Sequence, residues 1–310
     1  MEASNFRSKG VKDILFNINN MPELCPELQC MLDHLDDCRC FMPEEYVNRK
    51  CQKLFQYLST NKLKAAIVSV SGGIDSAVVL SILVETKKRY SNIYDFKIIG
   101  LAQPIDSTPE IQARAYEVAA LKGIELIEIN QSEEHHSIIA KIEKQTGELA
   151  HFSKSMFKSY QRTPTAYLLA SHYGGAVIGT GNLDEDGYLY YFCKFGDGAV
   201  DIGLIWDLHK IDVYAVGKYL GVPESILVAP PSADLMPGQT DENEMGVSYD
   251  MVRLIYSLNY STIQMTPKER LKWLESLSDE ALVQYMGAKR IIDEIHTKGH
   301  HKADLNPILL

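Results

Sequence analysis

The sequence lacks the features that mark membrane, secreted and nucleic-acid-binding proteins. Its 310 residues contain no uninterrupted apolar run of the ~20 residues that a membrane span needs, and no signal-peptide core follows the polar residues 1–7. Positive charge is in deficit, because 31 Lys and Arg stand against 41 Asp and Glu, a formal net charge of −10. We therefore expect a cytoplasmic protein with small-molecule partners, and neither a membrane nor a nucleic acid among them.

Paired cysteines are also missing. The chain has no Cys-x-x-Cys spacing, and Cys193 stands far from the other five cysteines, which lie between Cys25 and Cys51. We interpret all six as the reduced thiols of a cytosolic protein. The alternative is a metal site shared by Cys30, Cys38 and Cys40.

Two common phosphate-binding signatures are absent, but a third pattern is present. The chain has neither a Walker A ending nor a Gly-x-Gly-x-x-Gly, which argues against kinase-like and dinucleotide-binding Rossmann proteins. Instead, an apolar run at 65–70 and a helix-like pattern at 77–83 flank the segment Ser69-Val70-Ser71-Gly72-Gly73-Ile74-Asp75-Ser76. Adjacent glycines let backbone N–H groups approach an anion at a helix N-terminus. The segment predicts a phosphate-binding turn, against the alternative of a plain Ser/Gly turn.

Strand-like and helix-like patterns alternate along the chain, which predicts an α/β fold. Strands are expected at 65–70, 96–101, 124–129 and 176–179, and helices at 44–58, after Asp75, from 109 to 122, at 135–144, 152–173 and 210–220. This spacing indicates a mainly parallel sheet with helices on both faces, followed by a helical C-terminal part. Pro164 is expected to begin a new helix capped by Thr163. Residues 181–209 and 228–240 are predicted to be rich in loops.

The chain divides into two parts in this interpretation. Residues 1–40 are rich in Cys, Asp and Pro and only weakly periodic, so they are predicted to form an N-terminal extension that is partly ordered. Residues 41–310 are predicted to form the main domain.

Further polar segments follow the predicted strands. Glu185 comes after the last strand, so it can meet Asp75 at the same sheet edge and share a magnesium ion with it, or it can lie in a solvated acidic loop. Lys210 opens a helix, where the dipole disfavours a cation, so it neutralises phosphates or is an ordinary surface lysine. Asp197, near Lys194, sits between two glycines and can simply cap their turn.

Together these segments resemble the NAD+ synthetase family of the PP-loop ATP pyrophosphatases. The resemblance runs in unbroken order from Glu44 to Asp250 through SGGIDS, GTGNLDE, KFGDGAVDI, LHKIDVY, LGVPESI and PPSADLMPGQTDENEMGVSYD. It implies an adenine nucleotide alpha hydrolase-like, Rossmann-like fold. It also implies a ligase for the final step of NAD+ biosynthesis: ATP adenylates the nicotinate carboxylate of deamido-NAD+, pyrophosphate leaves, and ammonia attacks the adenylate to give NAD+ and AMP.

The resemblance implies a role for individual residues. The catalytic residues are Asp75, Lys210 and Asp234, and Asp75 and Glu185 ligate Mg²⁺. The implied ATP-binding residues are Ser69, Ser71, Gly72, Gly73, Asp75, Ser76, Thr180, Lys210 and Ser232. The implied deamido-NAD+ contacts are Arg162, Lys194, Asp197 and Asp201. The chain departs from the family at Tyr160, where an arginine is common, and at Cys193, where a hydroxyl residue is common.

The length of the chain before the main domain bears on the source of ammonia. The forty residues before the main domain are too few for the amidase domain of glutamine-using members, so free ammonia or a separate ammonia-supplying protein is expected. The resemblance also implies a homodimer. Two alternatives remain: another PP-loop adenylating enzyme, of the tRNA-thiolation or GMP synthetase type, or a catalytically silent nucleotide-binding homologue.

Overall fold

The computed structural model describes residues 22–235, 238, 240–260 and 265–303. Residues 1–21 of the predicted extension, and positions 236, 237 and 239 of the predicted loop at 228–240, lie outside the described residues.

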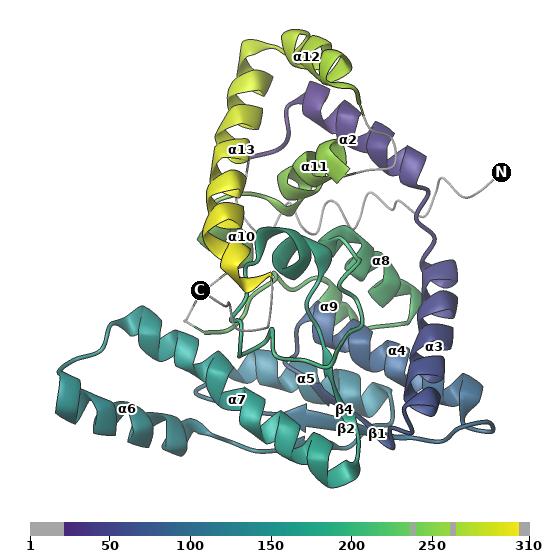
Figure 1. The fold of residues 1–310 in the computed structure, drawn as a ribbon, viewed down its shortest axis with the longest axis vertical. Helices are drawn as coiled ribbons and strands as arrows, with labels where there is room; N and C mark the ends of the chain where they lie inside the picture. Colours follow the sequence, from purple (N-terminus) through teal and green to yellow (C-terminus); the bar gives the residue numbers. More distant parts are fainter. Residues whose placement is uncertain (1–21, 236–237, 239, 261–264, 304–310) are drawn as a thin grey trace, which may run out of the picture.

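A parallel sheet forms the base of the molecule (Figure 1). Its strand order is β3-β2-β1-β4-β5, and every described pair of neighbouring strands runs parallel. The strands are β1 (Ala65–Ser69), β2 (Lys97–Ala102), β3 (Leu126–Glu128), β4 (Ala176–Gly179) and β5 (Ile202–Gly203). The helices around it are α3 (Pro43–Thr60), α4 (Ile74–Tyr90), α5 (Pro109–Leu121), α6 (Ser132–Thr146), α7 (His151–Tyr173), α8 (Lys210–Tyr219) and α9 (Glu224–Leu227). The predicted fold class is confirmed.

Alternation along the central strand separates the two faces of the sheet. Ala66 and Val68 of β1 pack into the core formed with α3, α4, α5 and α8, whereas Ala65 and Ile67 pack on the other face against Ala166 of α7. Helix α4 is buried along most of its length because α3 and α8 also contact it. Helices therefore cover both faces, which explains why the first four residues of β1 are all apolar rather than alternating.

A second core holds the helical end of the chain. It contains α2 (Pro26–Arg39), α10 (Asp241–Met245), α11 (Tyr249–Tyr260), α12 (Pro267–Glu275) and α13 (Asp279–Gly299), followed by the short 3₁₀-helix η3 (His300–Lys302). Leu28, Leu32 and Leu35 of α2 recur at helical spacing and are buried in this core. Figure 1 shows α2, α11, α12 and α13 grouped away from the sheet. The division of the chain at residue 40 stays a prediction.

Ion pairs tie α2 to both parts of the molecule. Arg39 donates to both carboxylate oxygens of Asp212 in α8, with 2.8 Å between Nη2 and Oδ1. Arg253 of α11 is only 3 % exposed, and its guanidinium lies 2.9 Å from Asp36 and 2.7 Å from Asp250. The Arg253 pairs lie where water is scarce, whereas Arg39 is partly exposed and binds the buried Asp212 through two hydrogen bonds. Both contacts give α2 a defined position between the two cores.

The prediction for Pro164 is wrong. Helix α7 continues through Pro164 without ending, and Thr163 does not cap a helix but donates its hydroxyl to the carbonyl oxygen of Gly196 at 2.9 Å. A proline inside a helix removes one backbone hydrogen bond. The buried residues before and after the proline, Ser159 on one hand and Ala166 and Ala170 on the other, lie on one face of α7, and their contacts hold the helix in place despite that loss.

The segment 181–209 is more regular than its composition predicts. Residues Leu183–Leu189 form a π-helix, η2, in which the N–H of Gly187 donates to the carbonyl oxygen of Asn182 at 3.2 Å. The side chain of Asn182 also accepts from the N–H of Glu185 at 3.0 Å. Asp184 and Asp186 of this turn are buried rather than solvated. A π-helical turn is rare and often marks a functional site.

None of the helices in the described ranges is both long enough and apolar enough to cross a membrane.

Two glycines provide a test of the packing between α7 and the sheet. A Cβ on Gly175 would lie 2.2 Å from the carbonyl oxygen of Ala65, so Gly175→Ala should lower the free energy of unfolding by about 1–3 kcal/mol. Gly287, exposed in α13 with open space around it, is the matched control, and Gly287→Ala should raise that free energy by about 0.5–1 kcal/mol. Urea unfolding of both variants measures the difference; equal effects would contradict the described packing.

Candidate active site

The turn between β1 and α4 is folded by its own serines. Gly72 has φ +90°, and a Cβ there would lie 2.1 Å from the carbonyl oxygen of Ile111, so only glycine fits. The hydroxyl of Ser76 lies 3.2 Å from the N–H of Ser71 and 3.1 Å from its hydroxyl, and it donates to the carbonyl oxygen of Gly73 at 3.0 Å. The serines thus shape the turn at the N-terminus of a 17-residue helix, where an anion is favoured.

A buried lysine joins two carboxylates beside this turn. Lys210 is 1 % exposed, and its Nζ lies 2.6 Å from Oδ2 of Asp75 and 2.9 Å from Oε1 of Glu185. Asn182 donates to the other oxygen of Asp75 at 3.1 Å. The structure therefore brings together three residues predicted for the site, from the first turn of α4, from η2 and from the start of α8. We call Asp75, Glu185 and Lys210 the carboxylate–lysine cluster.

Several residues that hold this cluster were not predicted from the sequence. Tyr249 donates its hydroxyl to Oε1 of Glu185 at 2.5 Å and lies 3.2 Å from Oδ2 of Asp241. Asp184 accepts from the backbone N–H of Lys210 at 2.7 Å and lies 2.6 Å from Nδ1 of His209. All lie within the motifs GTGNLDE, LHKIDVY and TDENEMGVSYD. Their pairing across the fold is what singles them out, and no spacing along the chain carries that signal.

Burial and mutual attraction act in opposite directions on the charges of the cluster. Burial would lower the pKa of Lys210, but Asp75 and Glu185 raise it well above its ordinary value. Burial would raise the pKa of Glu185, but Lys210 and the Tyr249 hydroxyl lower it. The pKa of Asp75 is raised, chiefly by burial, and that of Asp241 is raised to about 7 by burial and by Glu185. Lys210 is therefore a cation, and Glu185 a carboxylate, at neutral pH.

We call the turn between β1 and α4, residues 70–73 together with the Ser76 side chain, the serine turn. A pocket opens next to it, at the carboxyl ends of β1 and β2. Ser69, Ser71, Gln103, Arg162 and Asp234 line it, among others. Ser69 donates to Oε1 of Gln103 at 2.9 Å, and Gln103 in turn exchanges hydrogen bonds with the backbone carbonyl and the Nε of Arg162 at 2.8 and 3.1 Å. Ligands of parallel α/β sheets bind at this edge.

Asp234 in this pocket and the nearby Ser232 are already engaged in hydrogen bonds. Both carboxylate oxygens of Asp234 accept from Thr108, one from its N–H at 3.0 Å and one from its hydroxyl at 2.7 Å. Ser232 accepts from the N–H of Asp234 at 3.1 Å. Arg162 shares the pocket with Asp234, so it lies on the side of the serine turn, and burial lowers its pKa. Thr180 follows β4 at the neighbouring strand end.

The residues predicted to contact the dinucleotide hold local structure. Asp197 accepts from the hydroxyl of Ser159 and from the N–H of Cys193, both at 2.9 Å, so it closes the turn that begins at Cys193. Asp201 accepts from the N–H of Val177 at 2.8 Å, at the edge of the sheet. Lys194 extends over the ring of the exposed Phe195. Asp197 and Lys194 thus lie in one loop, whereas Asp201 lies beside Val177 of β4, just before β5.

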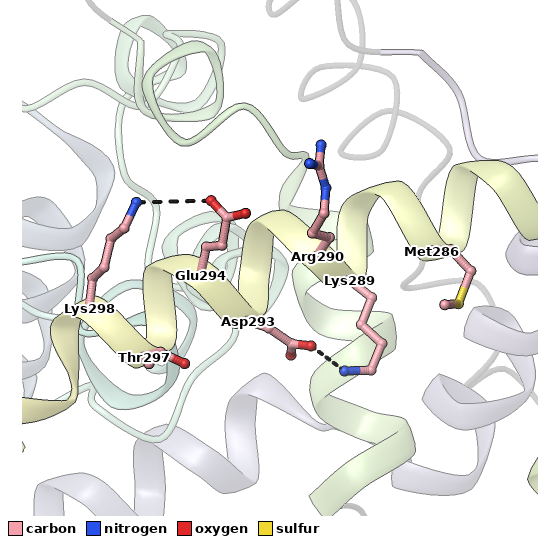
Figure 2. A pocket seen from close by; sticks show the side chains of 7 residues that line it. All are labelled: Met286, Lys289, Arg290, Asp293, Glu294, Thr297 and Lys298. Atoms are coloured by element: carbon pink, nitrogen blue, oxygen red, sulfur yellow. Dashed lines mark hydrogen bonds and ion pairs between the residues drawn. The ribbon is translucent and has the colours of Figure 1, made fainter.

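A second hollow lies along the outer face of α13 (Figure 2). Its charged side chains pair within the helix, Lys289 with Asp293 and Lys298 with Glu294. No residue that lines it belongs to the serine turn or to the carboxylate–lysine cluster. The pocket beside Ser71 is therefore the candidate active site.

A parallel sheet with an anion-binding turn and a carboxylate–lysine cluster at its carboxyl edge defines a nucleotide-binding α/β protein. The model of the family described as NAD synthase matches residues 46–302, and the chain therefore belongs to the NAD synthase family.

Relatives and solved structures agree with this membership. The NH(3)-dependent NAD(+) synthetase of Alkaliphilus metalliredigens is 32% identical over 249 residues, which cover 78% of this chain and 88% of that protein. The enzyme of the same name from Alkaliphilus oremlandii is 38% identical over 196 residues, 61% of this chain and 75% of that protein. The NMN synthetase of Francisella tularensis superposes with a TM-score of 0.71 at 30% identity, covering 87% of this chain and 99% of its own.

Removing the buried cation tests the cluster. Lys210→Met should lower the free energy of unfolding by about 3–5 kcal/mol at pH 8, because two largely buried carboxylates lose a fully buried counter-charge. The pKa of Glu185 is lowered from its ordinary value of 4.5, so the stability that this shift contributes is fully present above pH 4.5 and is lost as the pH falls below it. The deficit should therefore shrink only below about pH 4.5. Urea unfolding at pH 8 and at pH 3.5 measures both effects.

The control is Lys289→Met, which breaks a partly exposed pair with Asp293 on α13. It should change the free energy of unfolding by less than about 1 kcal/mol at either pH. A Lys210→Met deficit that is as small as the control's, or that grows in acid, would contradict the described charge state.

Proposed function

We propose that this chain is an ATP-dependent ligase that joins ammonia to the carboxylate of deamido-NAD+, giving NAD+, AMP and pyrophosphate. The observation that carries the proposal is the carboxylate–lysine cluster beside the serine turn, in a chain of the NAD synthase family. The relatives named NH(3)-dependent NAD(+) synthetase support ammonia as the nitrogen donor.

The residues fit the first half-reaction, in which the substrate carboxylate attacks the α-phosphorus of ATP and pyrophosphate leaves. Backbone N–H groups of the serine turn and the N-terminus of α4 bind the departing phosphates. Lys210 is held as a cation by its neighbours, so its charge offsets the negative charge that develops on the leaving group. In this proposal Ser69, Ser71, Gly72, Gly73, Ser76, Thr180 and Ser232 bind ATP.

The donor set also fits a divalent cation such as Mg²⁺. Asp75 and Glu185 bring two carboxylates to the mouth of the serine turn, and Mg²⁺ is usually bound by one or two carboxylates together with phosphate oxygens and waters. Within the described residues no three His, Cys, Asp or Glu side chains gather as a metal site, as expected for an ion that takes its other ligands from ATP. Bound there, the cation would neutralise phosphate charge.

In the second half-reaction ammonia attacks the acyl-adenylate and AMP leaves. We propose Arg162, Lys194, Asp197 and Asp201 as contacts of the pyridine nucleotide. Asp234 is proposed as a catalytic residue that meets the incoming ammonia, and Thr108 holds its carboxylate in place. The protein is proposed to be a cytoplasmic homodimer that uses free ammonia or ammonia from a separate protein. The exposed Ile142 of α6 and Phe152 and Leu168 of α7 provide apolar surface for a dimer.

A second candidate acid is nicotinate mononucleotide, whose amide is NMN. The NMN synthetase of Francisella tularensis is 30% identical to this chain, and the match covers 99% of that protein and 87% of this chain. Tyr160 occupies a position where the family resemblance expects an arginine, which suits an acid with one phosphate rather than two. The reaction is otherwise the same.

The assay combines the purified protein with ATP, Mg²⁺, ammonium and either deamido-NAD+ or nicotinate mononucleotide, and follows AMP together with NAD+ or NMN. AMP formation equal to amide formation with one of these acids is expected. If AMP appears only with a different acceptor, such as a tRNA or xanthosine monophosphate, the proposed function is wrong and the chain is another adenylating enzyme.

Asp75→Ala tests the cluster in the same assay. Turnover should fall about 100-fold or more, because the divalent cation that neutralises the phosphates in the transition state would lose one of its protein ligands. Asp293→Ala, on the outer face of α13, is the control and should keep wild-type turnover. Melting curves show whether each variant is folded, and wild-type turnover in folded Asp75→Ala would remove Asp75 from the mechanism.

A further inference from the structure

Tyr249 reaches into the carboxylate–lysine cluster from the second core of the molecule, which we call the helical core. It is the first residue of α11, a helix that packs with α2 and α13, and yet its hydroxyl donates to Oε1 of Glu185 at 2.5 Å. The side chain is almost completely buried. A tyrosine whose ring lies in one core and whose hydroxyl meets a carboxylate of the neighbouring site links the two parts of the molecule.

Two donors from different elements meet on one oxygen of Glu185. Lys210 approaches Oε1 from α8 at 2.9 Å, and Tyr249 approaches the same atom from α11. Because both donors hold Oε1, the last torsion angle of Glu185 is fixed and the direction of Oε2 is fixed with it. The carboxylate is thus oriented before a ligand arrives.

Tyr249 is itself held in place at both ends. Its backbone N–H donates to Oε1 of Glu242 at 2.8 Å, and its hydroxyl lies 3.2 Å from Oδ2 of Asp241. The Nζ of Lys210 lies 5.3 Å from the centre of the Tyr249 ring, within cation–π distance. The ring and the hydroxyl therefore act on both charged partners of the cluster.

We propose that Tyr249 is a positioning residue, which orients Glu185 toward the divalent cation that accompanies ATP, and that Asp241 orients the Tyr249 hydroxyl. This inference rests on the proposed function, since it assigns Glu185 to a metal–ATP complex. It gives the helical core a part in the reaction that the sequence motifs do not assign to it. Partners that orient a metal ligand typically contribute 10–100-fold to metal affinity or activity.

The test is Tyr249→Phe, which removes the hydroxyl and keeps the ring. Mn²⁺ binding in the presence of the non-cleavable α,β-methylene analogue of ATP is followed by electron paramagnetic resonance. The variant should bind Mn²⁺ about tenfold more weakly and have a kcat about tenfold lower, with an unchanged KM for the pyridine nucleotide. Tyr260→Phe, at the exposed end of the same helix, is the matched control and should behave as the wild type.

Wild-type Mn²⁺ affinity in Tyr249→Phe would overturn the proposal and leave Tyr249 a packing residue. If Tyr249→Phe does not fold, Asp241→Asn decides, because it keeps the tyrosine: weaker Mn²⁺ binding supports the proposal and unchanged binding overturns it. The Mn²⁺ measurement needs no turnover. If the wild-type protein amidates neither pyridine nucleotide, the proposed function is wrong. The Mn²⁺ affinities of the wild type and of Tyr249→Phe would still show whether Tyr249 orients Glu185.

Discussion

The ammonium group of Lys210, buried between Asp75 and Glu185, is the interaction on which the rest of the site depends. Burying a charge is costly unless it is paired and hydrogen-bonded, and here two carboxylates from separate segments do both. The lysine also begins a helix, where the dipole opposes a cation; Asp184 accepts from its backbone N–H and places a negative charge at that end. The requirement to satisfy one cation thus determines how the serine turn, η2 and α8 meet.

The two cores are joined by the same kind of constraint. Arg253 in α11 pairs with Asp36 of α2, and Arg39 of α2 pairs with Asp212 of α8. Removing either partner of the Arg253–Asp36 pair would leave an uncompensated buried charge. Arg39 is partly exposed, but its two hydrogen bonds to the buried Asp212 orient α2 on α8. Together the pairs specify how the helical core sits on the sheet. Tyr249 can meet Glu185 only in that arrangement. The geometry of the site is therefore a property of both cores, and the N-terminal helix α2 belongs to its support.

Much of this architecture follows from local patterns in the sequence. The apolar run before Ser71 and the paired glycines after it predict the strand, the turn and the helix, because each depends on neighbouring residues alone. The meeting of Asp75 with Glu185 follows from parallel topology, since strand ends share one edge. The continuity of α7 through Pro164 and the π-helix η2 do not follow. Both depend on packing and hydrogen bonds with distant segments, such as Thr163 with Gly196 and Asp184 with His209.

The residues that the sequence motifs assign to substrate binding show the same limit. Asp197 and Asp234 are acids in polar loops, which is the pattern of a binding residue and equally of a turn cap. The structure finds Asp197 accepting from Ser159 and Cys193, and Asp234 accepting from Thr108. A carboxylate that holds its own loop in this way can still face a ligand, because each oxygen accepts more than one hydrogen bond.

The choice between one acid and another involves different residues from those that drive the chemistry. Deamido-NAD+ and nicotinate mononucleotide carry the same reacting carboxylate on the same ring, so the cluster and the serine turn meet identical atoms in both. The acids differ only in the adenylate that lies beyond the first phosphate. In the proposed reaction the turnover therefore depends on Asp75, Glu185 and Lys210, whereas selectivity depends on what surrounds the far end of the substrate, and the position of Tyr160 is where this chain departs from the family pattern.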